Sequence, residues 1–390
     1  MRRLHLPIHF ALLLIVPLGL SSRASAQIRC HFPKQYPTIA SEMKDKDVVV
    51  IASLREHHPE APLGVERQPV AFETALVIKG DKLARPKQLV RAECGYSEAA
   101  AGERFLIMAT SDSGALTWDA ATRLTPAGEG YIVKLTQLPA DGKERYLFFQ
   151  SHLEHQDDVV AHDAYEELWS LPYAKLREMR DQMPHDSLVS WIQAKETRSS
   201  HRRLYLQMLG VCGKEQDVPM LEKEIAAADP KNRGLEAVIS CFLSLRGNAG
   251  MKLVEERFLT NKTASYPDIY AATMALRFHA RQEKIIHRDD LLRGFHFILD
   301  RPEIADLIIP DLVQLEDWEQ AEHLAEMFKT ADVKNTWFRE PVINYLRACP
   351  LPIADKLLRE CEQLDPKAAK AARQRQPVVE KKPLRVAEGK

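Results

Sequence analysis

The sequence predicts an α+β protein of two domains, in which a small antiparallel β-barrel is followed by an α-solenoid of helical hairpins. Two observations carry this prediction. Short segments rich in β-branched and aromatic residues dominate residues 27–151. Apolar stripes with helical spacing recur at nearly constant intervals through residues 200–365. The chain of 390 residues is long enough to form two separate hydrophobic cores.

Residues 1–26 have the composition of a signal peptide. Two arginines at the start precede a short apolar core, FALLLIVPLGL at 10–20, and an Ala-Ser-Ala cleavage site ends before Gln27. The apolar core is too short to span a bilayer comfortably, and no later run approaches that length. We therefore expect an exported protein, periplasmic or extracellular, without a transmembrane segment.

The net charge limits the classes of partner that are expected, and the number of cysteines bears on possible disulfides. The formal net charge is −1, which does not indicate a surface for nucleic acid or for acidic substrates. Six cysteines are an even number, which permits disulfides in an exported protein. We favour a bridge only between Cys30 and Cys94. The cysteines of the helical region are expected to be small buried apolar residues.

Six segments between residues 40 and 151 are predicted to be strands, because they are short and separated by Gly, Pro, Asp and Lys. They are DVVVIASL (47–54), AFETALVI (71–78), QLVRAE (88–93), RFLIMAT (104–110), YIVKLTQL (131–138) and RYLFFQS (145–151). Together they predict a small antiparallel barrel.

Part of this barrel resembles the netrin/TIMP-like module. That family has a Cys, a D-V-V strand, a V-x-x-V-x-K-G strand, a second Cys and a G-x-x-Y/F-L strand. The corresponding segments here are Cys30, DVVVIASL, FETALVIKGD (72–81), ECG (93–95) and GERFLIMA (102–109), with Thr74 in place of the first Val. The resemblance implies an OB-like barrel that takes part in protein interactions.

A protease-inhibitor role is an alternative that this resemblance raises. The metalloprotease inhibitors of the family bind the catalytic zinc with a cysteine at the mature N-terminus. Cleavage after Ala26 would leave three residues ahead of Cys30, which argues against that mechanism.

Residues 152–199 are expected to be connecting helices, and they begin with a cluster of histidines and carboxylates. His152, His155 and His162 crowd together with three aspartates, which are ligand types that zinc and similar ions accept. A metal-dependent enzyme or metal-binding protein with its site at 152–163 is therefore the alternative function. The favoured interpretation is a polar linker without metal or cofactor, in which Asp157 or Asp158 caps a helix.

The apolar stripes at 200–365 predict stacked helical hairpins, because each stripe is followed by a second one. The stripe ends are spaced by 34, 33, 36 and 33 residues and lie at Gly213, Gly247, Ala280, Glu316 and Cys349. Both glycines are expected to end helices in the left-handed conformation. The pattern is typical of HEAT-like arrays, and residues 201–213 are similar to uncharacterised exported bacterial proteins with such repeats. The alternative is a plain helical bundle with accidental spacing.

No sequence motif in the chain indicates catalysis, since both Gly-x-x-x-x-Gly-Lys-Ser/Thr and Gly-x-Ser-x-Gly are absent. Helical arrays expose long concave surfaces. We therefore predict a non-catalytic adaptor or scaffold of the cell envelope that binds another protein. Trp318, Trp337 and Phe338 are candidates for a partner groove, although a place in the core is the favoured interpretation.

The basic tail, residues 366–390, contains few large apolar side chains. It is expected to be disordered because it lacks enough apolar surface to bury. A weak contact with an anionic envelope surface is the functional alternative for this segment.

Overall fold

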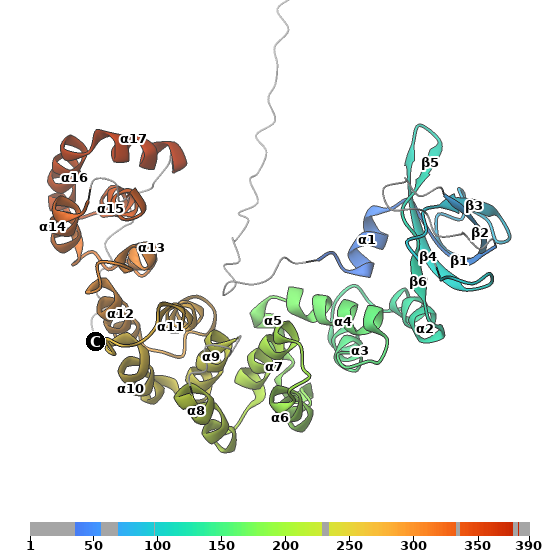
Figure 1. Ribbon diagram of the computed structural model, residues 1–390, viewed down its shortest axis with the longest axis horizontal. Helices are drawn as coiled ribbons and strands as arrows, with labels where there is room; N and C mark the ends of the chain where they lie inside the picture. Colours follow the sequence, from blue (N-terminus) through green and yellow to red (C-terminus); the bar gives the residue numbers. More distant parts are fainter. Residues whose placement is uncertain are drawn as a thin grey trace, which may run out of the picture.

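The computed structural model describes residues 36–55, 69–96, 98–227, 234–332, 336–376 and 381. In these ranges one antiparallel sheet precedes sixteen α-helices, α2 to α17, so the α+β prediction is confirmed. Figure 1 shows the helices following one another along an arc, with the sheet at one end and α13 to α17 at the other. None of the helices in these ranges is long and apolar enough to cross a membrane.

The sheet is antiparallel and nearly closed, in the manner of a barrel. Its strand order is β3-β2-β1-β4-β5, and β6 also pairs with β4. An isolated bridge between Cys94 and Ala121 joins the segment after β3 to the segment before β6. The strands are β1 (Val48–Leu54), β2 (Val70–Lys79), β3 (Leu89–Ala92), β4 (Arg104–Asp112), β5 (Ala115–Trp118) and β6 (Thr122–Leu124), and the short helix α1 (Ile39–Asp45) precedes them.

Strand β1 lies in the centre of the sheet and is buried on both faces. Val48 and Val50 belong to the core enclosed by the sheet, together with Phe105 of β4. Val49 and Ile51 point to the opposite face and join the core that continues into the helices. A strand that is covered on both sides reads as a continuous apolar run, which explains why this segment shows no alternation.

Two of the six predicted strands are helices, which corrects the expectation for 131–138 and 145–151. They form α2 (Pro126–Leu135) and α3 (Lys143–Gln150). The side chain of Thr125 accepts a hydrogen bond from the amide of Gly128, and proline occupies the first turn of α2. The apolar residues of α2 have high β propensity, but packing against α4 and β6 at helical spacing decides their conformation.

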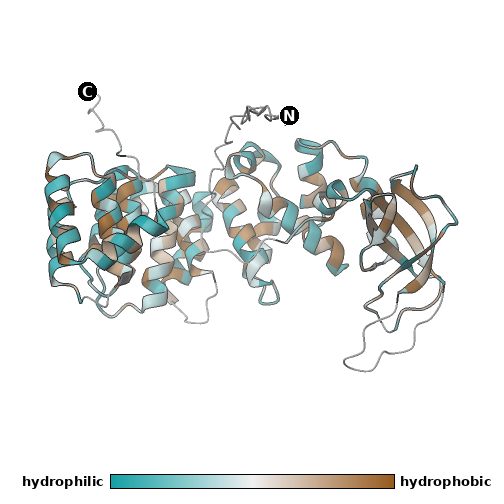
Figure 2. Ribbon diagram, turned by 90° about the horizontal axis from the view of Figure 1, so that it is seen from above, coloured by the Kyte–Doolittle hydropathy of each residue, from teal (hydrophilic) through white to brown (hydrophobic). Residues whose placement is uncertain are grey.

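The remaining helices lie in two rows along the arc (Figure 1). The inner row consists of α7, α9, α11, α13 and α15, and consecutive members α7–α9, α9–α11 and α13–α15 are in contact. The outer row includes α6, α8, α10, α12, α14 and α16. In Figure 2 hydrophilic and hydrophobic residues alternate along the helices, as in helices with one buried face.

The bounds of these helices are α4 (Asp158–Ser170), α5 (Tyr173–Glu178), α6 (His185–Gln193), α7 (Ser199–Cys212), α8 (Val218–Ala227), α9 (Leu235–Arg246), α10 (Met251–Val254), α11 (Tyr266–Phe278), α12 (Arg288–Leu299), α13 (Ile309–Gln314), α14 (Ala321–Thr330), α15 (Thr336–Ala348), α16 (Pro352–Leu364) and α17 (Pro366–Arg375).

The expected disorder of the basic tail is wrong for its first part, because residues 366–375 form α17. The carboxylate of Asp365 accepts a hydrogen bond from the amide of Ala368 and thereby caps the N-terminus of the helix. Its buried face consists of small residues that lie against α15: Ala368, Ala369 and Ala372. Alanine has the highest helix propensity and permits close approach, so large apolar side chains are not needed here.

Candidate binding cleft

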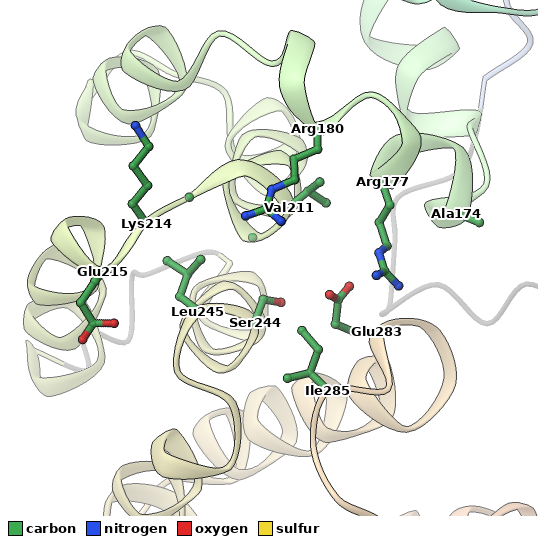
Figure 3. Close-up of a pocket in the computed structure, with 12 residues that line it drawn as sticks. Ala174, Arg177, Arg180, Val211, Lys214, Glu215, Ser244, Leu245, Glu283 and Ile285 are labelled. Carbon is green, nitrogen blue, oxygen red and sulfur yellow. The ribbon is translucent and has the colours of Figure 1, made fainter.

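A cleft of about 610 Å³ opens where the inner helices α7 and α9 end (Figure 3). Its walls come from α5, from a short 3₁₀ turn at Arg180–Gln182, and from the π-helical turn His279–Glu283 that continues α11. The lining residues are Ala174, Arg177, Arg180, Gly210, Val211, Gly213, Lys214, Glu215, Ser244, Leu245, Glu283 and Ile285.

Gly213 shapes the cleft at the end of α7. Its amide donates to the carbonyl of Leu209 at 2.6 Å, and the chain then leaves the helix in an extended conformation with φ −66°. A Cβ at this position would lie 2.5 Å from the Leu209 oxygen. The expected left-handed conformation is therefore wrong for Gly213. Gly247 at the end of α9 has a positive φ of +57°, which favours glycine, but its ψ of −146° differs from that of a left-handed helical cap.

Gly210 allows α7 and α9 to cross closely at the floor of the cleft. A Cβ at Gly210 would lie 3.3 Å from the hydroxyl oxygen of Ser244. That hydroxyl donates a hydrogen bond to the carbonyl of Ser240 one turn earlier. The floor is therefore made of small groups that leave the space above them open.

Three cationic side chains surround this space. Figure 3 shows the guanidinium groups of Arg177 and Arg180 extending into it, while Lys214 stands at the rim with its amine directed outward. Glu215 is paired with Arg246 at 2.5 Å. In the part of the chain that the structure describes, no carboxylate lies within 4.0 Å of the charged nitrogens of the three cations.

Glu283 supplies a buried carboxylate on the opposite wall. It is 7% exposed, and its carboxylate is directed toward the space between Arg177 and Arg180 (Figure 3). Burial raises the pKa of Glu283 above its usual 4.5, while the hydroxyl of Tyr173 and the charge of Arg177 act to lower it. Its Oε2 atom is buried, and the hydroxyl of Tyr173, which lies beside the carboxylate, is buried as well.

The cleft is lined by charged, small and apolar groups. The lining residues include no cysteine or histidine, and the hydroxyl of Ser244 is already engaged with a backbone carbonyl. Cys212 lies next to the cleft, but burial raises the pKa of its thiol to about 11, so the thiol stays protonated near neutral pH.

The three histidines between residues 152 and 162 contact neighbouring aromatic rings and backbone groups. The ring of His152 lies 4.6 Å from that of Phe148 and its Nδ1 is 2.7 Å from the Phe148 carbonyl oxygen. His155 accepts a hydrogen bond from the amide of Asp157 through Nδ1. His162 lies between the rings of Tyr36 and Tyr165.

These histidines do not converge on a metal position. Within the described ranges, no group of three or more His, Cys, Asp and Glu side chains could hold an ion. The expected helix cap is present, because Asp157 accepts hydrogen bonds from the first amides of α4.

The three aromatic candidates have different environments. Trp318 and Phe338 lie in the core, 6% and 3% exposed, whereas Trp337 is 75% exposed. Trp337 lines a second cavity of about 430 Å³ between α13 and α15, beside Pro310 and Pro341.

The cysteines of the helices form no disulfide with one another in the ranges that the structure describes. Cys241, Cys349 and Cys361 are buried among apolar side chains, and Cys212 is partly buried. Cys94 carries a free thiol, and its expected partner Cys30 lies outside the described residues.

Arg177, Arg180 and Glu283 were not singled out by the sequence. They come from α5, the 3₁₀ turn and the extension of α11, so no short spacing connects them. The one local signal was Gly213, which marked the end of α7 but not the cleft beside it. No family model, no curated protein and no solved structure matches this chain.

Proposed function

We propose that this protein is an exported, non-catalytic adaptor or scaffold that binds another protein along the inner row of helices. The observation that carries the proposal is the cleft at α7 and α9, where Arg177 and Arg180 extend into open space without a carboxylate partner in the described chain. Arginine is enriched at protein-binding hot spots because its planar group makes several directed hydrogen bonds.

We further infer that the helices form a HEAT-like solenoid. Contacts of α7 with α9, of α9 with α11 and of α13 with α15, and the contact of α14 with α16 in the outer row, support this interpretation. The near-constant spacing of the apolar stripes supports it as well. In such an array the inner row offers a long surface that a partner chain contacts at several points.

Export and the OB-like character of the barrel are parts of the same proposal. Export is supported by the composition of residues 1–26, which lie outside the described ranges. The nearly closed sheet and the netrin/TIMP-like pattern support a barrel that takes part in interactions. The inner row remains the proposed principal surface.

Site-specific photo-crosslinking in the native cell tests the proposal. A photoreactive amino acid replaces Lys214 at the rim of the cleft, and in a matched control it replaces Lys223, an exposed lysine of α8 in the outer row. We expect a discrete crosslinked protein from position 214 and none from position 223. Identical products from both positions, or none from either, would contradict the proposal.

A further inference from the structure

We propose that the cleft at the ends of α7 and α9 receives an acidic segment of the partner, a peptide stretch rich in Asp or Glu. This inference rests on the proposed protein-binding function and names the class of segment that the cleft recognises.

The balance of charge in the cleft favours an anion. Arg177 and Arg180 contribute two positive charges inside the cleft, Lys214 contributes a third at its rim, and Glu283 contributes one negative charge. Glu215 does not enter the balance because Arg246 neutralises it. The ends of α7 and α9 each contribute roughly half a negative charge, so about one positive charge remains. The negative helix ends therefore stabilise the cationic side chains nearby, but they offset only part of the positive charge.

The two arginines favour carboxylate groups as ligands. Their guanidinium groups extend into the open space of the cleft (Figure 3). A guanidinium group pairs with a carboxylate through two parallel hydrogen bonds, which gives the contact a defined geometry. An acidic peptide presents several carboxylates along one chain, so it can reach both arginines at once.

The walls of the cleft also suit a peptide. Val211, Leu245 and Ile285 contribute apolar surface between the charged groups, and Ile285 is 39% exposed. The volume of about 610 Å³ accommodates a few residues of an extended chain. The methylene groups of glutamate side chains would lie against these apolar residues while their carboxylates reach the arginines.

Fluorescence anisotropy on the full chain tests this inference. The probe is a fluorescein-labelled oligoglutamate, and an oligoglutamine of the same length is the control peptide. We expect the oligoglutamate to bind, with an affinity that falls as salt increases, and the oligoglutamine not to bind. Failure of the oligoglutamate to bind overturns the inference.

Variants locate the binding on the protein. Arg180→Gln is expected to weaken oligoglutamate binding about tenfold, a loss typical of one charged contact at an interface. Arg359→Gln, on the exposed face of α16, is expected to change it less than about twofold. An equal effect of both substitutions would assign the binding to diffuse charge and overturn the inference.

Glu283→Gln gives a test with the opposite sign. It keeps the shape of the side chain and an acceptor oxygen but removes a negative charge facing the ligand, so oligoglutamate binding is expected to tighten. Circular dichroism shows whether Arg180→Gln folds. If it does not fold, the result for Glu283→Gln decides the test, and unchanged or weaker oligoglutamate binding by Glu283→Gln overturns the inference.

The two proposals can fail separately. A crosslinked partner at position 214 without oligoglutamate binding would support the protein-binding function and contradict the inference that the bound segment is acidic.

Discussion

Asp163 joins three segments where the sheet meets the helices. It is 4% exposed, and its carboxylate accepts hydrogen bonds from the amide of Ile39 at 2.6 Å and from the hydroxyl of Tyr131 at 2.7 Å. Burial raises the pKa of Asp163 to about 6, although both hydrogen bonds act to lower it. The group therefore ionises close to neutral pH, unlike an exposed aspartate.

This shift predicts a pH dependence of stability. Because the folded pKa lies above the unfolded value of 3.8, the folded state binds the proton more tightly. The resulting stabilisation is fully present below pH 3.8 and is lost as the pH rises through 6. Two pKa units correspond to about 3 kcal/mol in the free energy of unfolding.

Urea denaturation of the wild type and Asp163→Asn across this pH range measures the effect. The difference in free energy of unfolding between the two proteins should change with pH in the stated direction, because all other titrating groups are shared. A constant difference from pH 4 to pH 7 would show that Asp163 titrates normally.

Gly213 predicts a second effect at the scale of one residue. Gly213→Ala places a Cβ 2.5 Å from the Leu209 carbonyl oxygen and is expected to cost about 1–3 kcal/mol of stability. Gly130, an exposed residue of α2 with no atom within 4 Å of an added Cβ, provides the control. Gly130→Ala should stabilise by about 0.5–1 kcal/mol, since alanine favours the helix interior. Thermal unfolding of both variants measures these changes in stability. A Gly213→Ala variant as stable as the wild type would contradict the steric argument.

At the scale of elements, a buried ion pair at the start of α17 contributes to its contact with α15. Arg339 is 2% exposed and donates to the carboxylate of Asp365 at 3.1 Å, and its guanidinium also lies 4.6 Å from the ring centre of Phe328. The carboxylate of Asp365 caps α17 at the same time. One side chain thus starts the helix and neutralises a buried cation.

Asp365→Ala is expected to destabilise the protein by about 3–5 kcal/mol, because it leaves Arg339 buried without its partner. Asp355→Ala is the control, since Asp355 is exposed and its pairing with Lys381 should contribute at most about 1 kcal/mol. Hydrogen exchange should show selective loss of protection in α17. Equal effects of the two substitutions would contradict this account.

The sequence predicted the elements with unequal success, for physical reasons. The strands β1 to β4 were found because β-branched residues and turn signals agree there. The helices α2 and α3 were missed because Tyr131, Ile132 and Phe149 have high β propensity, and helix caps with tertiary packing outweigh it. Helix α17 was missed because its buried face is alanine, which the search for large apolar residues overlooks.

The cleft could not be predicted from the sequence, even though the helices around it were. Its charged residues come from segments more than a hundred residues apart, from Arg177 to Glu283. Their proximity is a product of how α5 and α11 are placed on α7 and α9. A local pattern identifies a helix end such as Gly213, but it does not reveal which side chains meet there.

At the scale of the whole molecule, a buried ion-pair cluster joins two helices of the inner row. Asp311 of α13 is 3% exposed and accepts hydrogen bonds from Arg277 at 2.8 Å and Arg281 at 3.2 Å, both on α11 or its extension. This cluster fixes α13 relative to α11 by polar contacts in addition to apolar packing. An inner surface held in this way would meet a partner with little loss of conformational entropy.

The central claim is that the cleft contacts a protein partner, and photo-crosslinking from position 214 in an Arg180→Gln background tests it most directly. We predict that the discrete product seen from position 214 falls about tenfold in this background, and that it is unchanged in the Arg359→Gln background. A product that persists at full yield with Arg180→Gln would show that the partner does not use the cleft.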